Sequence, residues 1–500
     1  MSLDRSRLQS FPAKPRVFVI SDISNEPDDA ESLVRYLLYA NQFDTEGLVA
    51  CTSTWMRTKV CPQDMHKIID GYEKVVDNLN RHAHPDHPYP SADYFRSIVK
   101  EGPAVYGSQA VGDDIPLTSG GQLLLDRLKA SDPRPLWVLA WGGTNVLAQV
   151  LHKVQQHETA SEAARLRSKL RVYTISDQDD TGIQIRTRHP DIFYICSVHA
   201  WCSYGLATWS GIFGENYYGF DSGGPDSSLF TREWIADKIR IGDLGGRYPD
   251  FMAIPEGDTP TFLYLIQNGL GVREHPEYGS WGGRYALTGP HASPAGQSPR
   301  HYSDVADIVV GKDGRTHTSN HATVWRWREA YQSDFAARMQ WTLGPGAAGS
   351  LGRANHHPVV FVNGEAGPEA LHIEAEAGSS VRLDASATYD PDGDDLTFRW
   401  WHYREPTATQ WSALQEVAEV QIKHEGGDPA VVDVVLPGPE KCCVNLLDRQ
   451  AVLKGHAMHV ILQVTDGGTP SLTSYKRVII QATNKDLRGS GKLRSAIGDE

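Results

Sequence analysis

An acidic turn near the N-terminus is the strongest chemical signal in this sequence. The segment ISDISNEPDDA places four carboxylates and an asparagine within eight residues: Asp22, Asn25, Glu26, Asp28 and Asp29. Carboxylates this close together repel one another unless a cation or a hydrogen-bonded polar ligand neutralises them. Hard divalent cations prefer oxygen ligands of this kind. The turn is therefore a candidate divalent-metal site.

A purely structural explanation covers part of this cluster. Asp28 and Asp29 fall in the first turn of an expected helix, where the N-terminal dipole favours acidic side chains. That explanation needs no ligand, but it leaves out Asp22, which comes at the end of the preceding strand.

Strands alternating with helices must position this turn. The apolar run Arg16–Ser21 predicts a strand, and the periodicity of Ala30–Ala40 predicts a helix. Further strand-like runs begin at Gly47, Leu136, Leu170 and Phe193. This alternation predicts an α/β fold with a mainly parallel open sheet flanked by helices, and ligands bound beyond the carboxyl ends of the strands.

The composition changes near residue 345, where the Gly- and Ala-rich stretch GPGAAGSLGRANHHP begins. Short strand-like runs separated by turn residues follow it, which indicates an all-β sandwich. We expect a domain over 1–345, a linker over 346–357, a β-sandwich over 358–484 and a polar tail over 485–500.

Bulk properties exclude several classes of function. The 500 residues carry a formal net charge of -14, which argues against a protein that tracks the phosphates of a nucleic acid. The sequence has no apolar run of about 18 residues, so we expect no membrane-spanning helix. The N-terminus has no apolar core of a secretory signal, which by sequence favours the cytoplasm.

Three motifs together resemble those of the inosine-uridine-preferring nucleoside hydrolases. They are the Asp-rich turn ending in DDA, the segment VLAWGGTNVLAQVL over 138–151, and EGDTPTFL over 256–263. In that family the threonine of the second motif gives a backbone carbonyl to calcium, and the third supplies the last carboxylate. The resemblance implies a Ca²⁺ site formed by Asp22, Asp29, Thr144 and Asp258. Asp258 is also compatible with a simple N-cap before a helix.

Longer motifs resemble a narrower family, the nucleoside-hydrolase-like, cellulose-binding proteins of bacteria and fungi. They are DISNEPDDAESLVRYLLY, SDQDDTG, the stretch from EGDTPTFLYLIQNGL to GSWGGRY, and NHATVWRWREAYQSDFAARMQWTL before a β-sandwich. This resemblance covers nearly the whole chain. It implies a carbohydrate partner and a C-terminal carbohydrate-binding module, in a family whose members are often secreted, and it is compatible with a homodimer.

Two positions depart from the nucleoside hydrolase pattern. Ser24 stands where that family has the aspartate that binds calcium and deprotonates water, and Gly257 replaces the histidine before the late aspartate. A serine hydroxyl is a poor general base at neutral pH. The catalytic candidates are therefore other acids, namely Asp22, Glu26, Asp28, Asp177 and Asp180. Asp177 and Asp180 belong to a second acidic segment after the fourth strand, which is also compatible with a solvated turn.

Polar and aromatic residues near the expected cleft are candidates for binding a sugar. They are Asn25, Asn145, His199, Trp201, Glu215, Asn216, Trp281 and Arg284. Flat amphipathic rings suit the faces of sugars, although Trp281 is equally compatible with a place in the core. In the C-terminal part, DPDGDD over 390–395 resembles the turn of PKD-like and cadherin-like sandwiches, which implies an Ig/PKD-like sandwich. The segment is compatible with a calcium loop or with a hairpin turn.

These signals favour a glycoside hydrolase that uses a Ca²⁺-bound water on an O- or N-glycosidic bond of a plant- or microbe-derived carbohydrate. A non-catalytic carbohydrate-binding or cellulose-binding protein remains an alternative, because Ser24 replaces the expected base. A divergent nucleoside hydrolase is the third reading, which the missing histidine disfavours.

Overall fold

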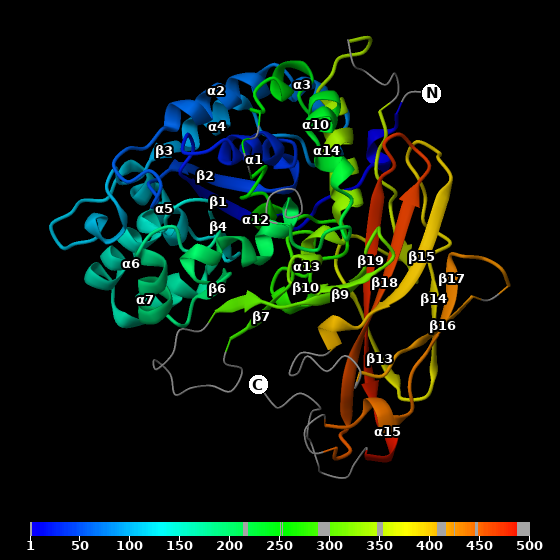
Figure 1. Ribbon diagram of the computed structural model, residues 1–500. Helices are drawn as coiled ribbons and strands as arrows, with labels where there is room; N and C mark the ends of the chain where they lie inside the picture. Colours follow the sequence, from blue (N-terminus) through cyan, green and yellow to red (C-terminus); the bar gives the residue numbers. More distant parts are fainter. Residues whose placement is uncertain are drawn as a thin grey trace. The chain divides into compact units, whose positions relative to one another are not determined.

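The computed structural model describes residues 3–213, 219–250, 252, 254–288, 301–347, 354–407, 417–424, 426–445 and 449–487. The chain divides into two compact units (Figure 1). The unit that we call the α/β unit comprises Pro12–Ile266 and Ser280–Ala354. The sandwich unit comprises Met1–Phe11, Gln267–Gly279 and Asn355–Glu500.

An eight-stranded sheet organises the α/β unit, with the strand order β3-β2-β1-β4-β5-β6-β8-β7. Its strands are β1 Arg16–Ser21, β2 Asp44–Ala50, β3 Val99–Glu101, β4 Leu136–Ala140, β5 Leu170–Thr174, β6 Phe193–Cys196, β7 Tyr285–Leu287 and β8 Tyr302–Asp304. All neighbours pair in parallel except β7 and β8. The prediction of a mainly parallel open sheet is confirmed.

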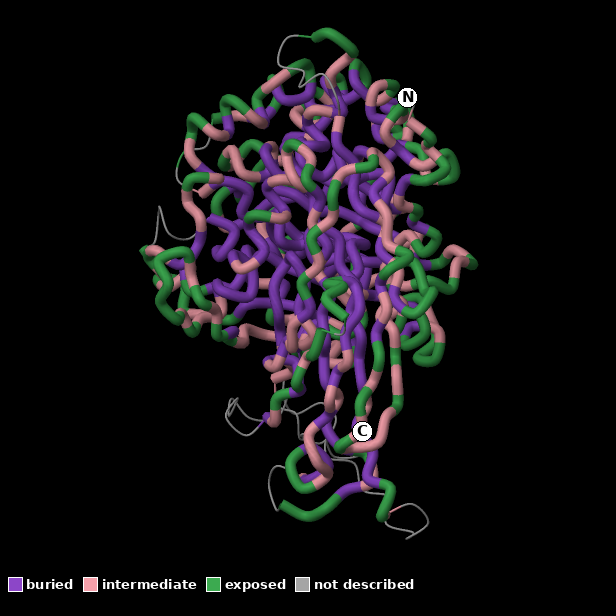
Figure 2. The backbone as a smooth tube through the Cα atoms, turned by 90° about the vertical axis from the view of Figure 1, so that its right-hand side faces the viewer, coloured by how far each residue is buried: buried purple, intermediate pink, exposed green. Residues whose placement is uncertain are grey.

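Helices cover both faces of this sheet. They are α1 Asp28–Leu37, α2 Pro62–Glu73, α3 Val76–Arg81, α4 Ala92–Ile98, α5 Ser119–Lys129, α6 Asn145–His157, α7 Ala160–Ser168, α8 Thr181–Arg188, α10 Arg232–Lys238, α11 Gly242–Gly245, α12 Pro260–Leu263, α13 Ala322–Trp325 and α14 Arg328–Trp341. Apolar side chains of α5 to α8 pack on one face, whereas rings such as Tyr36 and Phe262 pack beside Trp141 on the other. Figure 2 shows buried segments in the interior and exposed ones around them.

The C-terminal strands form two facing sheets, which confirms the all-β prediction for this part of the chain. One sheet has the order β13-β19-β18-β15 and the other β14-β17-β16. Their bounds are β13 Leu371–Glu376, β14 Ser380–Asp384, β15 Leu396–Tyr403, β16 Gln421–His424, β17 Val431–Val435, β18 Lys454–Asp466 and β19 Thr473–Thr483. Smaller elements are the hairpins β9 Asp307–Val310 with β10 Thr316–Ser319 and β11 Phe361–Val362 with β12 Glu365–Ala366, and helix α15 Pro439–Cys442.

Segments distant in sequence complete the sandwich unit. The backbone N–H groups of Tyr475 and Arg477 donate to the carbonyls of Asn268 and Gly269 at 2.8 and 3.0 Å. Near the N-terminus, Gln9 donates from Nε2 to the Ser474 hydroxyl at 2.9 Å. Strand β19 therefore binds two segments from distant parts of the chain besides its sheet neighbours β13 and β18. Within the described ranges, no helix is long and apolar enough to cross a lipid bilayer.

Candidate metal centre and sugar site

The turn between β1 and α1 brings the first acidic residues together at the carboxyl edge of the sheet. Asp22 directly follows β1, while Asp28 and Asp29 form the first turn of α1. Ser21 donates its hydroxyl to an oxygen of Asp29, and the backbone N–H of Asn25 donates to the Asp22 carbonyl at 3.1 Å. The strand end and the helix start are thus joined by a short, hydrogen-bonded turn.

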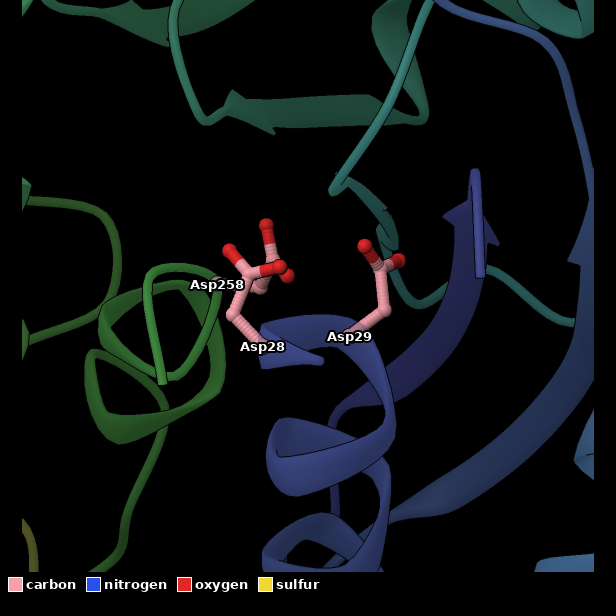
Figure 3. A group of neighbouring side chains, drawn as sticks. All are labelled: Asp28, Asp29 and Asp258. Carbon is pink, nitrogen blue, oxygen red and sulfur yellow. The ribbon is translucent and has the colours of Figure 1, made fainter. Parts of the chain in front are cut away.

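Asp258 reaches the same place from the loop that precedes α12. One oxygen from each of Asp28, Asp29 and Asp258 lies within 4.8 Å of the others (Figure 3). Asp22 lies beside them, since Coulombic interactions with it raise the pKa values of Asp28, Asp29 and Asp258. We call these four residues the acidic cluster. The expected ligands Asp22, Asp29 and Asp258 converge here, together with Asp28.

Burial is the main reason that every acid of the cluster has a raised pKa. It raises the pKa of Asp22 to about 6 and that of Asp28 to about 8, with the charge of Glu26 adding to both. The pKa values of Asp29 and Asp258 also lie well above their ordinary range, through burial and then through the other carboxylates. A bound cation would favour the charged forms and oppose both effects.

Two carboxylate oxygens indicate that a cation fits this place. The Oδ2 atoms of Asp22 and Asp258 are buried, and neither has a hydrogen-bond partner within the described residues. A buried oxygen without a partner costs free energy, which a divalent ion bound by several oxygens would recover. The carboxylates therefore match the donors that Ca²⁺ requires.

Thr144 belongs to the turn beside the acidic cluster. A Cβ atom placed on Gly142 would lie 2.8 Å from the Cβ of Asp22, so the turn and Asp22 are in close contact. Thr144 is the N-cap residue of α6; its carbonyl accepts the N–H of Ala148 at 3.0 Å, and its hydroxyl bonds Thr181 at 2.8 Å. The second lone pair of that carbonyl is what a metal would use. As a ligand, Thr144 stays a prediction.

A buried ion pair stabilises the loop that carries Asp258. Arg35 of α1 donates to Glu256 at 2.8 Å, and both side chains are fully buried. Glu31 accepts the backbone N–H of Glu256 at 2.8 Å. Glu256 has a left-handed backbone, with a φ of 55°, which a non-glycine residue adopts only when its surroundings enforce it. The two side chains of α1 thus fix the turn that carries Asp258.

Ser24 adopts a left-handed conformation with a φ of 81°, in the turn between Asp22 and Asp28. Its hydroxyl donates to an oxygen of Asp64 on α2. The expected base is therefore replaced by a serine that holds a carboxylate from another helix.

The other candidates of the turn, Asn25 and Glu26, are partly or largely exposed. The charge of Glu26 raises the pKa values of Asp22, Asp28 and Asp258, which places Glu26 beside the acidic cluster at its exposed rim.

The geometry explains the glycine at position 257. A Cβ atom there would lie 2.7 Å from Oδ2 of Asp28 and 3.4 Å from the Ile254 side chain. A histidine would push Asp28 out of the acidic cluster. The position of Asp28 therefore leaves no room for a histidine side chain at position 257.

Replacing Gly257 by alanine tests this arrangement. We expect Gly257→Ala to weaken Ca²⁺ binding at least about tenfold in calorimetric titration, because the methyl group displaces Asp28. Gly344→Ala is the matched control, since the nearest atom to a Cβ at position 344 is 3.9 Å away. An affinity equal to that of the control would show that Asp28 does not help to hold the ion.

The second acidic segment is tied into the structure by its own partners. Asp177 forms a bidentate ion pair with Arg186, with both N–O distances at 2.7 Å. Asp180 accepts the backbone N–H and the hydroxyl of Ser108 at 2.7 and 2.6 Å. Asp179 accepts the backbone N–H groups of Asn145 and Thr181 at 3.1 and 2.8 Å. These three carboxylates are therefore held in place at this edge of the sheet by their own hydrogen bonds.

Asn145 also connects segments at this edge of the sheet. It is fully buried, and its side-chain amide donates to the Thr52 hydroxyl at 2.9 Å and to the Val105 carbonyl at 3.0 Å. Its contacts join three segments of the sheet edge.

His199 and Trp201 follow β6 at this same edge. His199 is half-buried, with Nε2 at 2.8 Å from the Ser176 hydroxyl, and Trp201 is 46% exposed. Ser176 also accepts the indole N–H of Trp209 at 3.1 Å. Glu215 and Asn216, predicted to bind substrate, lie outside the described residues.

Two predicted substrate contacts lie in the interior. Trp281 is only 1% exposed, with its ring centroid 6.4 Å from that of Tyr331. Arg284 is 7% exposed and donates from Nε to Asp307 at 2.7 Å. Trp281 therefore occupies the core position that the sequence left open, and Arg284 is paired with Asp307; as sugar contacts, both residues stay predictions.

Sequence reasoning missed two residues at this edge, Ser53 and Trp55. Contact with the Ser53 hydroxyl opposes the rise of the Asp22 pKa, and that hydroxyl oxygen accepts the N–H of Trp55 at 3.0 Å. Trp55 is 53% exposed. The only available signal was their position after the second strand.

The sandwich unit has an acidic group of its own. One oxygen from each of Asp390, Asp392 and Asp394 lies within 4.8 Å of the others. Oδ1 of Asp390 accepts the N–H groups of Asp392 and Asp394 at 2.8 and 3.1 Å, as in an ordinary turn. The calcium loop and the hairpin turn both remain compatible with this segment.

Comparison with known proteins identifies relatives of both parts of the chain. The family model described as cellulose-binding Sde182, nucleoside hydrolase-like domain, matches residues 16–285. The model for the C-terminal domain of cellulose-binding protein Sde0182 matches residues 380–482. No curated protein matches the chain.

Among solved structures, a nucleoside hydrolase-related hypothetical protein from Saccharophagus degradans, associated with carbohydrate metabolism, is 29% identical with a TM-score of 0.74. The alignment covers 94% of this chain and 100% of that one. The effector protein XOO4466 is 12% identical with a TM-score of 0.33, over 66% of this chain and 95% of that one. With more than half of its length matched by one family model, the chain belongs to the nucleoside-hydrolase-like, cellulose-binding Sde182 family.

Proposed function

We propose that the chain is a glycoside hydrolase that depends on Ca²⁺ and acts on an O- or N-glycosidic bond of a plant- or microbe-derived carbohydrate. The observation that carries this proposal is the convergence of Asp28, Asp29 and Asp258, beside the Oδ2 atoms of Asp22 and Asp258, which have no hydrogen-bond partner in the described part of the chain. The cellulose-binding description of the family supports a carbohydrate as the partner.

The side chains at the carboxyl edge of the sheet have different roles in this proposal, which follow from their positions. When bound, Ca²⁺ would orient sugar hydroxyls and make a coordinated water easier to deprotonate. Asp22, Asp28, Asp29 and Asp258, with the Thr144 carbonyl, would hold the ion. Glu26, at the exposed rim of the acidic cluster, would accept a proton from a water beside it.

A residue from another part of the carboxyl edge of the sheet would donate the proton to the leaving group. Both oxygens of Asp177 are taken up by Arg186, and both oxygens of Asp180 by Ser108, so these acids position the edge instead. His199 is the candidate donor in this segment: its Nδ1 lies 2.9 Å from the Ala200 carbonyl, and its Nε2 would exchange the Ser176 hydroxyl, at 2.8 Å, for the leaving group.

Substitution of Asp29 tests the hydrolytic proposal. We expect Asp29→Asn to lower the turnover of aryl glycosides at least about 100-fold, because the substitution removes one charge from the ion site without changing the size of the side chain. Asp237→Asn is the control, since Asp237 is 71% exposed and pairs only with its neighbour Lys238 within the described residues. Turnover is followed by release of the aryl group, with Ca²⁺ and after EDTA.

The Ser24 contact favours one alternative, a binding protein that has lost its base. Binding of cello-oligosaccharides by the wild-type chain without turnover of any aryl glycoside or riboside would establish that alternative. Turnover of ribosides alone would identify a divergent nucleoside hydrolase.

A further inference from the structure

Two exposed tryptophans from separate loops lie against each other at the carboxyl edge of the sheet. Trp55 follows β2 and is 53% exposed, while Trp201 follows β6 and is 46% exposed. Their ring centroids are 5.4 Å apart and their planes differ by 31°. Single exposed apolar residues are common, but a contiguous pair built from two loops indicates a binding surface. We call Trp55 and Trp201 the tryptophan pair.

The loop of Trp55 is anchored to the acidic cluster. The Ser53 oxygen accepts the N–H groups of Trp55 and Met56 at 3.0 and 3.2 Å, which leaves its proton free to donate toward Asp22. The N–H of Thr54 donates to the Gln178 carbonyl at 2.6 Å. Trp55 therefore lies two residues after Ser53, whose side chain contacts Asp22, and its loop is also hydrogen-bonded to Gln178 through Thr54.

A run of rings links Trp201 to the other side of the acidic cluster. The ring centroid of Trp201 lies 5.3 Å from that of Tyr204, which lies 5.0 Å from that of Trp209. A Cβ atom on Gly257 would lie 3.6 Å from the Trp209 ring and 2.7 Å from Asp28. The tryptophan pair is thus connected to the acidic cluster from both of its loops.

The chemistry of this surface matches one class of ligand. A pyranose ring has a flat C–H face that packs on an indole and a rim of hydroxyls that bind carboxylates or a cation. An indole pair beside a group of acids satisfies both needs. A nucleic acid would be repelled by the neighbouring carboxylates.

We propose that Trp55 and Trp201 form the stacking surface for one pyranose unit of a glycan whose adjoining unit lies at the acidic cluster. The stacking surface is a new subsite, and its pairing with the acidic cluster rests on the proposed function. Both residues are positioned to determine specificity, since they would contact the unit beyond the bond to be cleaved.

Substitution of either ring tests the subsite in the full-length chain. We expect Trp55→Ala and Trp201→Ala each to raise the dissociation constant for cellohexaose about five- to tenfold in calorimetric titration. Trp55→Phe and Trp201→Phe should retain most of the affinity, because a smaller ring still stacks. Val310→Ala is the matched control, as Val310 is an apolar residue that is 68% exposed. The melting temperatures of all variants should stay close to that of the wild type, since each indole is about half exposed to solvent.

Titration with and without EDTA separates this inference from the proposed function. A loss of affinity in the alanine variants that persists in EDTA supports the tryptophan pair even if the ion site fails. Affinities equal to that of Val310→Ala, or failure of the wild-type chain to bind cellohexaose and xylohexaose alike, would overturn the inference.

Discussion

Replacing Arg35 by methionine is expected to lower the free energy of unfolding by about 3–5 kcal/mol, because it leaves the carboxylate of Glu256 buried without its partner. Arg35 and Glu256 are both fully buried, and Arg35 also donates to Gln332 and to the Tyr331 carbonyl at 2.9 and 2.6 Å. Burial raises the pKa of Glu256, and the charge of Arg35 opposes that rise. Urea denaturation of the variant and the wild type measures the loss.

An exposed pair supplies the control for that measurement. Arg165 and Glu162 bond at 2.6 Å, but their side chains are 50% and 34% exposed, so Arg165→Met should cost less than about 1 kcal/mol. Arg35→Met should also weaken Ca²⁺ binding, since Glu256 stands two residues before Asp258. A loss of stability no larger than that of Arg165→Met would mean that solvent or a rearranged partner compensates Glu256.

Stabilisation by Ca²⁺ is expected to grow as the pH rises from about 5 to about 8. Without a cation, burial raises the pKa of Asp22 to about 6 and that of Asp28 to about 8, above the values near 3.8 of exposed carboxyls. These groups favour the folded state fully below about pH 4, and that contribution is lost as the pH rises through the folded-state values. A cation competes with the protons, so its effect is largest where the carboxyls would otherwise ionise unpaired.

Melting temperatures with Ca²⁺ and with EDTA across this pH range provide the measurement. At a Ca²⁺ concentration of about 1,000 times the dissociation constant, binding adds about 4 kcal/mol, which corresponds to roughly 10 °C. Asp258→Asn should abolish most of this difference. The control Asp237→Asn should preserve it, because Asp237 is an exposed aspartate. A difference that is absent at every pH, or that shrinks toward pH 8, would contradict the ion site.

Local patterns were sufficient to predict the α/β scaffold. The apolar run Arg16–Ser21 coincides with β1, and the helix expected from Ala30 begins at Asp28. Because parallel strands end at one edge, the placement of Asp22 and Asp29 followed from element order alone. Asp258 required the family resemblance, since nothing local distinguishes a ligand from an N-cap.

Contacts distant in sequence explain what could not be predicted. Arg35 and Glu256 are 221 residues apart, and their pairing depends on the packing of α1 against a later loop. Trp281 and Trp55 illustrate the same limit for aromatic residues. The first is covered in the core and the second is exposed, although both occur in short loops rich in small or polar residues.

The contacts of strand β19 set an order for folding during synthesis. Gln9 forms a hydrogen bond with Ser474, 465 residues later in the chain. The carbonyls of Asn268 and Gly269 accept hydrogen bonds from Tyr475 and Arg477. As the chain leaves the ribosome, both early segments must remain unpaired until β19 has been made. The sandwich unit is consequently completed only after Thr473–Thr483 has been synthesised, and a ribosome that stalls before residue 473 leaves the earlier segments without the strand that secures them.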